Sequence, residues 1–111
     1  MNFTQEQLNT IVNEALTEAR KAAETALAQF GDRDACGFAW CNIYGVKGNT
    51  KLGKMLEKAG VRRSAYEKCY QMWNPSKLGV QSMGILEAGA EAAAQVFRKY
   101  GFTAYSGSRM D

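Results

Sequence analysis

The stretch from Gly48 to Met55, GNTKLGKM, is the part of the sequence that most suggests chemistry. It matches the phosphate-binding pattern G-x-x-x-x-G-K-[ST] at every position but the last, where Met55 replaces the hydroxyl residue that would hold magnesium. In such a loop the lysine, here Lys54, reaches the terminal phosphate. The apolar spacing of Leu52, Met55 and Leu56 instead places Lys54 inside a helix. We therefore do not expect NTP hydrolysis here.

The same stretch predicts a helix start that can hold an anion. Either Asn49 or Thr50 can cap the helix, and the first amide groups of a helix attract negative charge. Lys47, Lys51 and Lys54 surround this point. Two interpretations stay open, a bound phosphate group or a solvated cap whose lysines serve solubility.

Basic and aromatic residues gather in the middle of the sequence. Residues 1–34 contain three basic and six acidic residues, whereas residues 46–68 contain seven basic and two acidic residues. Tyr44, Tyr66 and Trp73 lie in or beside the basic segment. Such a combination suits single-stranded nucleic acid or a small phosphorylated ligand. The alternative is a solvated helix beside a buried aromatic strand, and a pI near 8.8 argues against a dedicated polyanion binder.

The final residues, SGSRMD, add one more candidate. The guanidinium of Arg109 is a planar donor group that suits carboxylate or phosphate. This tail is expected either to fray or to place Arg109 beside the basic loop or in a neighbouring subunit. The candidate ligand-binding residues are together Tyr44, Lys47, Asn49, Thr50, Lys51, Lys54, Arg62, Arg63, Tyr66, Trp73 and Arg109.

Residue types that commonly carry catalysis or bind metals are scarce. Histidine is absent, which removes the commonest general base and metal ligand. Cys36 and Cys41 are separated by four residues rather than two, and Glu87 and Glu91 form an acidic pair of a kind that is usually exposed. We therefore predict a binding protein rather than an enzyme, with no metal and no cofactor.

The elements that position these residues begin with a long amphipathic helix over residues 4–30. Thr4 and Gln7 form a capping-box pair at its start, and Gly31 can close it. Such a helix would span roughly 39 Å, more than the roughly 26 Å expected for the diameter of a compact domain of this size. We expect part of it to pack on another copy of the chain, which predicts a homo-oligomer.

Residues 35–45, ACGFAWCNIYG, predict a strand with two unlike faces. The two-residue period places Phe38, Trp40 and Tyr44 on one side and small residues such as Gly37 and Ala39 on the other. The small face suits a helix lying close to the sheet. The large face needs cover from another layer, a partner or a ligand.

The remaining pattern completes an α-β-α-β-α-β order. It consists of a helix over 52–59, a strand over 64–73, a helix over 82–100 and a short strand followed by a polar tail. We predict an α+β or α/β fold of about three strands with the helices packed on one face, and strand direction stays open between parallel and antiparallel. The chain is expected to be one domain over 1–111, with residues 1–34 forming the long helix and turn and residues 35–111 the α/β core.

Composition predicts a cytoplasmic protein. The 111 residues are 46% hydrophobic and 23% charged, values typical of globular chains. No window approaches 18 apolar residues, and the first residues lack the pattern of a secretion signal. An odd number of cysteines, three, is expected to stay reduced. We expect no membrane association.

The segments CGFAW, QSM before the alanine-rich helix, and SRMD together resemble a family of small proteins of tailed bacteriophages. The resemblance covers residues 35–111 and implies a phage origin and the cytoplasm of an infected bacterium. It transfers no catalytic residue. It favours a host-takeover or anti-defence protein, and such proteins commonly act by binding.

Two hypotheses of function follow. The first is a non-catalytic phage accessory protein that binds a signalling nucleotide or a nucleic acid through the candidate residues above. The second is an inhibitor or assembly component that binds a host or phage protein through the long helix or the aromatic strand face.

Overall fold

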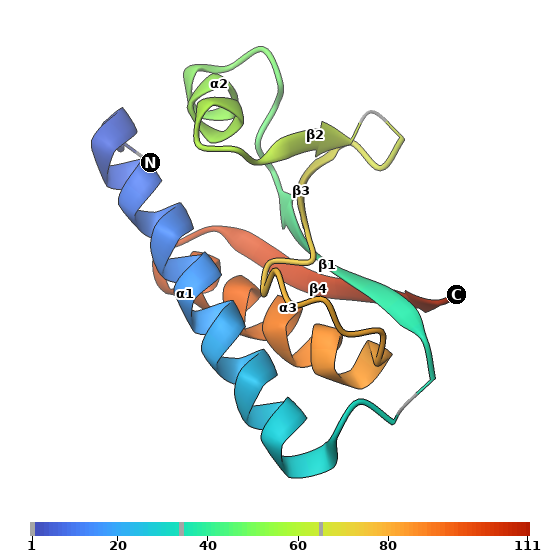
Figure 1. Ribbon diagram of the computed structural model, residues 1–111. Coiled ribbons are helices and arrows are strands. Elements are labelled where there is room, and N and C mark those ends of the chain that lie inside the picture. Colours follow the sequence, from blue (N-terminus) through green and yellow to red (C-terminus); the bar gives the residue numbers. More distant parts are fainter. Residues whose placement is uncertain (1, 34, 65) are drawn as a thin grey trace.

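The computed structural model describes residues 2–33, 35–64 and 66–111, and it has an α+β fold. Among these residues, three helices accompany one four-stranded antiparallel sheet (Figure 1). The elements are α1 (Gln5–Phe30), β1 (Gly37–Tyr44), α2 (Lys51–Lys58), β2 (Arg62–Ser64), β3 (Cys69–Trp73), α3 (Met83–Lys99) and β4 (Thr103–Met110).

The strands lie in the order β2-β3-β1-β4, and every neighbouring pair is antiparallel. From β1 onward the chain follows a β-α-β-β-α-β path in which β3 lies between β1 and β2. β1 is therefore a central strand, and all eight of its residues pair with β4. The question of strand direction is settled as antiparallel throughout the described sheet.

The predicted single strand over 64–73 is wrong, because a turn divides it. The hydroxyl of Ser64 accepts a hydrogen bond from the Glu67 N–H at 3.2 Å, and Lys68 adopts a left-handed φ of 57°. The Lys68 N–H also donates to the Ser64 carbonyl at 2.9 Å. β2 and β3 thus form a hairpin, which raises the number of described strands from the predicted three to four.

The C-terminal segment is a strand rather than a frayed tail. β4 runs to Met110 and pairs with β1 over its whole length, from Tyr44 opposite Thr103 to Gly37 opposite Met110. The Asp111 N–H then donates to the Cys36 carbonyl at 3.0 Å. Backbone pairing therefore fixes the position of Arg109 in the sheet.

Both long helices lie on one side of the sheet. The predicted start of α1 is confirmed, because the Thr4 hydroxyl and the Gln7 side chain form a capping box, and Gly31 ends the helix with a φ of 72°. α3 packs on β1 and β4, and α1 packs along α3 (Figure 1). The contact between the helices is close, since a Cβ on Gly89 of α3 would lie 3.1 Å from the Ala19 carbonyl oxygen.

The core lies between these helices and the inner side of the sheet. Its fully buried side chains include Leu8 of α1, Ile43 of β1, Tyr70 of β3 and Phe97 of α3. α2 packs near the start of α1 and beside β2, away from α3 (Figure 1). Of the helices in the described parts of the chain, none combines the length and the apolar character that a membrane crossing needs.

Candidate functional site: the open face of the sheet

The two faces of β1 differ as its alternating sequence predicts. Gly37, Ala39, Cys41 and Ile43 are buried against the helix side. On the opposite side, which we call the open face, no helix of the described residues packs in this way (Figure 1). By the register of the sheet, the side chains of the open face include Phe38, Trp40, Asn42, Tyr44, Arg62, Cys69, Gln71, Trp73, Tyr105 and Arg109.

Aromatic rings form two groups on the open face. At one end, Trp40 and Trp73 lie opposite each other on the two central strands, with ring centroids 4.7 Å apart, and Phe38 lies 6.4 Å from Trp73. At the other end, the rings of Tyr44 and Tyr105 are 6.3 Å apart. Phe38 is 39% exposed, Trp73 44% and Tyr105 56%, so ring faces and edges remain accessible to a ligand.

A polar network separates the two aromatic groups and orients Trp73. The Trp73 Nε1–H donates to Gln71 Oε1 at 3.2 Å, and Gln71 Nε2 donates to Asn42 Oδ1 at 3.0 Å. Asn42 is only 6% exposed and also accepts from the Cys69 thiol at 3.6 Å. The network holds the Trp73 indole in place before any ligand arrives, which lowers the entropy lost on binding.

Trp40 lies flat because its cross-strand neighbour is a glycine. A Cβ on Gly107 would approach Trp40 Nε1 to 2.5 Å, so only glycine leaves room for the indole at this position. The Nε1–H of Trp40 is buried and has no hydrogen-bond partner among the described residues. The indole thus packs on the backbone of β4 and forms an aromatic platform with Trp73, whose ring plane is tilted 32° from that of Trp40.

Two arginines bring positive charge to the open face. The guanidinium of Arg109 lies 5.4 Å from the centre of the Phe38 ring, a cation–π distance. Arg62 is opposite Gln71 on the edge strand β2 and is exposed. Both are members of the predicted set, and Arg109 flanks an aromatic side chain.

A cavity of about 370 Å³ adjoins the open face at the Phe38 end. It exists because β3 ends at Trp73 while β1 continues to Gly37, and the loop 74–81 bulges outward in the space between. Asn74 and Lys77 take left-handed φ values of 42° and 59° in this bulge. The loop returns to the strand where the Gly37 N–H donates to the Gln81 carbonyl at 3.1 Å.

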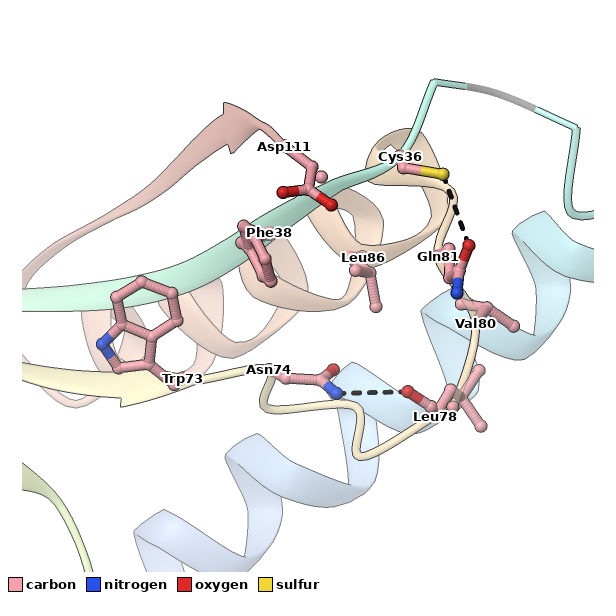
Figure 2. Close-up of a pocket in the computed structure, with 12 residues that line it drawn as sticks. Cys36, Phe38, Trp73, Asn74, Leu78, Val80, Gln81, Leu86 and Asp111 are labelled. Atoms are coloured by element: carbon pink, nitrogen blue, oxygen red, sulfur yellow. Dashed lines mark hydrogen bonds between the residues drawn. The ribbon is translucent and has the colours of Figure 1, made fainter.

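The walls of this cavity come from distant parts of the chain (Figure 2). Phe38 and Trp73 form an aromatic wall, Leu86 of α3 lies beneath, and the Asp111 carboxylate stands at the mouth. The Cys36 thiol donates to Gln81 Oε1 at 3.4 Å on the rim. The segments CGFAW, QSM and SRMD therefore meet at this one place.

The predicted basic site around α2 lies elsewhere. α2 begins at Lys51 with Thr50 as its cap, which confirms that Lys54 is inside a helix and not in a phosphate loop. The Thr50 hydroxyl accepts from the Gly53 N–H at 3.1 Å and donates to the Lys47 carbonyl at 2.6 Å. The cap position that an anion would need is therefore already occupied by a side chain of the chain itself.

Arg63, another predicted ligand residue, is engaged in the fold. Its Nη1 donates to the Val46 carbonyl at 2.6 Å, and its guanidinium lies 5.2 Å from the centre of the Tyr70 ring. Lys51, Lys54 and Lys58 instead line a groove of about 680 Å³ beside Phe3 at the start of α1.

Ten of the eleven predicted residues thus divide into two groups. The open face gathers Tyr44, Arg62, Trp73 and Arg109, while the α2 region holds Lys47, Asn49, Thr50, Lys51, Lys54 and Arg63. Tyr66 lies in the turn between β2 and β3 and is 96% exposed.

Residues that the structure places at the site but that the predicted set omits include Phe38, Trp40, Tyr105 and Asp111. The alternation of β1 already put Phe38 and Trp40 beside Tyr44, and that signal was sufficient to include them. Tyr105 and Asp111 depend on the pairing of β4 with β1, which joins residues far apart in sequence.

The thiols on the sheet are poorly suited to chemistry. Burial raises the pKa of Cys41 to about 12, and burial also raises the pKa of Cys69. Both therefore stay protonated and weakly nucleophilic at neutral pH. The arrangement of rings, arginines and a cavity is suited to stacking and charge neutralisation.

Comparisons of the chain with family models, with curated proteins and with solved structures give no match.

Proposed function

We propose that the protein is a non-catalytic accessory protein that binds single-stranded nucleic acid on the open face. The observation that carries the proposal is the aromatic platform of Phe38, Trp40 and Trp73 on the two central strands, in which Phe38 and Trp73 are exposed and Arg109 lies beside Phe38. Bases stack on such rings whatever their sequence, because every base has a flat π-face. The resemblance to a phage family also favours a protein that acts by binding.

The spacing of the two aromatic groups supports more than one bound base. Phe38, Trp40 and Trp73 lie at one end of the sheet, and Tyr44 and Tyr105 lie at the other, with Asn42 between them. Asn42, which is 6% exposed, and Gln71, whose amide is bonded to Asn42, Glu67 and Trp73, fill the space between the stacking positions. Duplex nucleic acid does not fit this mode, since its bases are stacked on one another.

The charge of the site predicts a shallow salt dependence. Arg62 and Arg109 are the basic residues on the open face by register. Each phosphate contact on a single strand contributes about −0.7 to the slope of log K against log salt, so two contacts give a slope of about −1.4. Binding led by stacking would therefore persist at salt concentrations that release a binder held by many lysines.

Fluorescence anisotropy with labelled single-stranded RNA and DNA tests the proposal. Base stacking is worth about 1–3 kcal/mol per base, so Phe38→Ala and Trp73→Ala should each weaken binding about tenfold or more. Phe30→Ala is the matched control, because Phe30 is 72% exposed on α1, away from the open face. Circular dichroism shows whether each variant is folded.

The proposal fails if Phe38→Ala and Phe30→Ala bind equally well, or if the duplex competes as strongly as the single strand. A second variant, Lys51→Ala with Lys54→Ala, separates the two basic regions. This double variant should bind like the unaltered protein, because both lysines lie on α2. A strong loss of affinity in the double variant would place the binding site at α2 instead.

A protein partner is the second candidate function, and the end of α1 favours it. Phe30 is 72% exposed and lines an open cavity of about 470 Å³ with Ala26 and Ile85. Such a surface suits a second copy of the chain or a host protein. Light scattering at high concentration tests the homo-oligomer, and a monomer that Phe30→Glu leaves unchanged would count against it.

A further inference from the structure

The cavity beside the open face is lined by residues that could select one kind of base, rather than only stack on any base. Phe38 and Trp73 form one wall, Leu78, Val80 and Leu86 supply apolar surface, and the Asp111 carboxylate lies at the mouth (Figure 2). We propose that this cavity holds one nucleobase and selects a base that offers N–H donors to Asp111, guanine foremost. The inference rests on the proposed function, because the base is delivered by a strand bound on the open face.

The size of the cavity supports a single planar ring system. Its volume of about 370 Å³ lies at the lower end of the range of roughly 300–1,000 Å³ found for small-ligand sites. The aromatic wall is continuous with the open face, since Phe38 and Trp73 belong to both. A strand stacked on Trp73 can therefore turn its next base into the cavity without leaving the surface.

The polar groups determine which base fits. A carboxylate accepts hydrogen bonds and donates none, so Asp111 favours a base edge that carries N–H groups. Guanine presents two neighbouring donors, N1–H and the N2 amino group, which match the two oxygens of one carboxylate. Uracil has one such donor on that edge, flanked by two carbonyl oxygens that the carboxylate repels.

The backbone of β1 offers the complementary donor. The Ala39 carbonyl accepts from the Asn74 N–H at 3.0 Å, and Ala39 lines the cavity. In an antiparallel strand the N–H and C=O of one residue point to the same edge, so the Ala39 N–H faces the bulged loop. A guanine O6 is an acceptor of the kind that this N–H requires.

Charge argues against the main alternative ligand, an alkylammonium group held between rings. The Arg109 guanidinium already lies 5.4 Å from the Phe38 ring centre, so a second cation there would be repelled. The same arginine suits the phosphate that links the captured base to the strand. Asp111 in turn repels phosphate from the cavity, which orients the strand with its base inward and its backbone outward.

The test uses uridine oligonucleotides that carry one central guanosine, inosine, adenosine or cytidine, with binding measured by anisotropy. The full chain should bind the guanosine oligomer about tenfold more tightly than the all-uridine oligomer. Inosine, which lacks the 2-amino group, should fall between them. Asp111→Asn should bring guanosine close to uridine while leaving uridine binding intact, because its backbone bond to Cys36 is kept.

Glu6→Gln is the matched control, since Glu6 is exposed on the first turn of α1. This control should keep the guanosine preference. Equal binding of all four oligomers, or an unchanged preference in Asp111→Asn, overturns the base-specific cavity and leaves the open face as a general binder. Competition by choline but not by guanosine monophosphate makes the cavity a cation site and also overturns the inference. Absence of binding to every oligomer refutes this inference and the proposed function together.

Discussion

The two faces of β1 are built from alternate residues of one eight-residue strand, yet they differ in size, burial and polarity. The closed face consists of small or aliphatic side chains, and Ile43 and Cys41 are fully buried there. The open face presents large rings that keep more than a third of the surface of Phe38, Tyr44 and Trp73 exposed. The closed face therefore stabilises the sheet against α3, while the open face leaves apolar surface exposed.

The largest expected effect comes from truncating neighbouring residues on opposite faces. Ile43→Ala leaves a cavity in the core, and such changes typically cost about 2–5 kcal/mol of the free energy of unfolding. Tyr44→Ala, one residue on, removes a side chain that is already 37% exposed and should cost less. Urea denaturation of both variants gives the two values. Equal losses of the free energy of unfolding would contradict the conclusion that the closed face contributes more to stability than the open face.

The next largest effect is a loss of stability expected at the aromatic platform, where Trp40 packs on Gly107. Gly107→Ala places a methyl group about where the Trp40 indole lies, so the ring must move and the free energy of unfolding should fall by about 1–3 kcal/mol. Gly79→Ala is the control, because no atom lies within 4 Å of a Cβ at that position. Tryptophan fluorescence and denaturation should change in the first variant alone. A native-like Gly107→Ala would mean that Trp40 is not confined by β4.

A smaller effect is expected at α2, the region that the sequence favoured. Thr50→Ala removes the cap of α2 and should lower the free energy of unfolding by about 1 kcal/mol. Thr50→Ser keeps the hydroxyl and serves as the control. Neither variant should change the affinity for single-stranded nucleic acid. A loss of affinity in Thr50→Ala without a loss in Thr50→Ser would return the ligand to the start of α2.

The smallest expected effect is a pH dependence of stability, caused by Glu91 on the helix side of the sheet. Glu91 of α3 is partly desolvated, which opposes its charge, but hydrogen bonds from Arg98 and Ser106 prevail and lower its pKa below the usual 4.5. The stability this gives is present above pH 4.5 and is lost as pH falls through the folded-state pKa.

Acid titration of thermal stability checks this expectation. Glu91→Gln should be less stable at neutral pH and should lose less stability below pH 4.5 than the unaltered protein. Glu87→Gln is a useful comparison, because Glu87 accepts a hydrogen bond from Ser108 at 2.6 Å but forms no ion pair among those found in the described residues. If thermal stability falls in parallel with pH in the unaltered protein and in Glu91→Gln, the pH dependence does not come from Glu91.

Local patterns were sufficient to predict much of this fold. The caps at Thr4 and Thr50, the glycine that ends α1 and the two faces of β1 all depend on residues near one another in sequence. The turn at Lys68 was missed because its left-handed backbone occurs at a lysine, where sequence gives little warning. The strand β4 was missed as a full element because its polar SGS segment is stabilised by pairing with β1, which no local pattern encodes.

The same contrast between local patterns and long-range pairing explains which residues of the site were predicted and which were missed. Basic residues close together in sequence drew attention to the region of α2 and β2, where Thr50 at the start of α2 and Arg63 of β2 bind the protein's own backbone. The cavity combines Cys36, Trp73, Gln81 and Asp111, which lie on four separate segments. Only the antiparallel order of the sheet brings these residues together.

The most direct test of the open face is NMR titration of the ¹⁵N-labelled protein with a short single-stranded oligonucleotide. The chain has two tryptophans, both on the open face, so their indole N–H signals report on the platform without further labelling. The account predicts that the Trp73 indole signal and the amides of Phe38 and Tyr105 shift, while those of Lys51 and Lys54 do not. Shifts confined to α2, or none at saturating oligonucleotide, would contradict it.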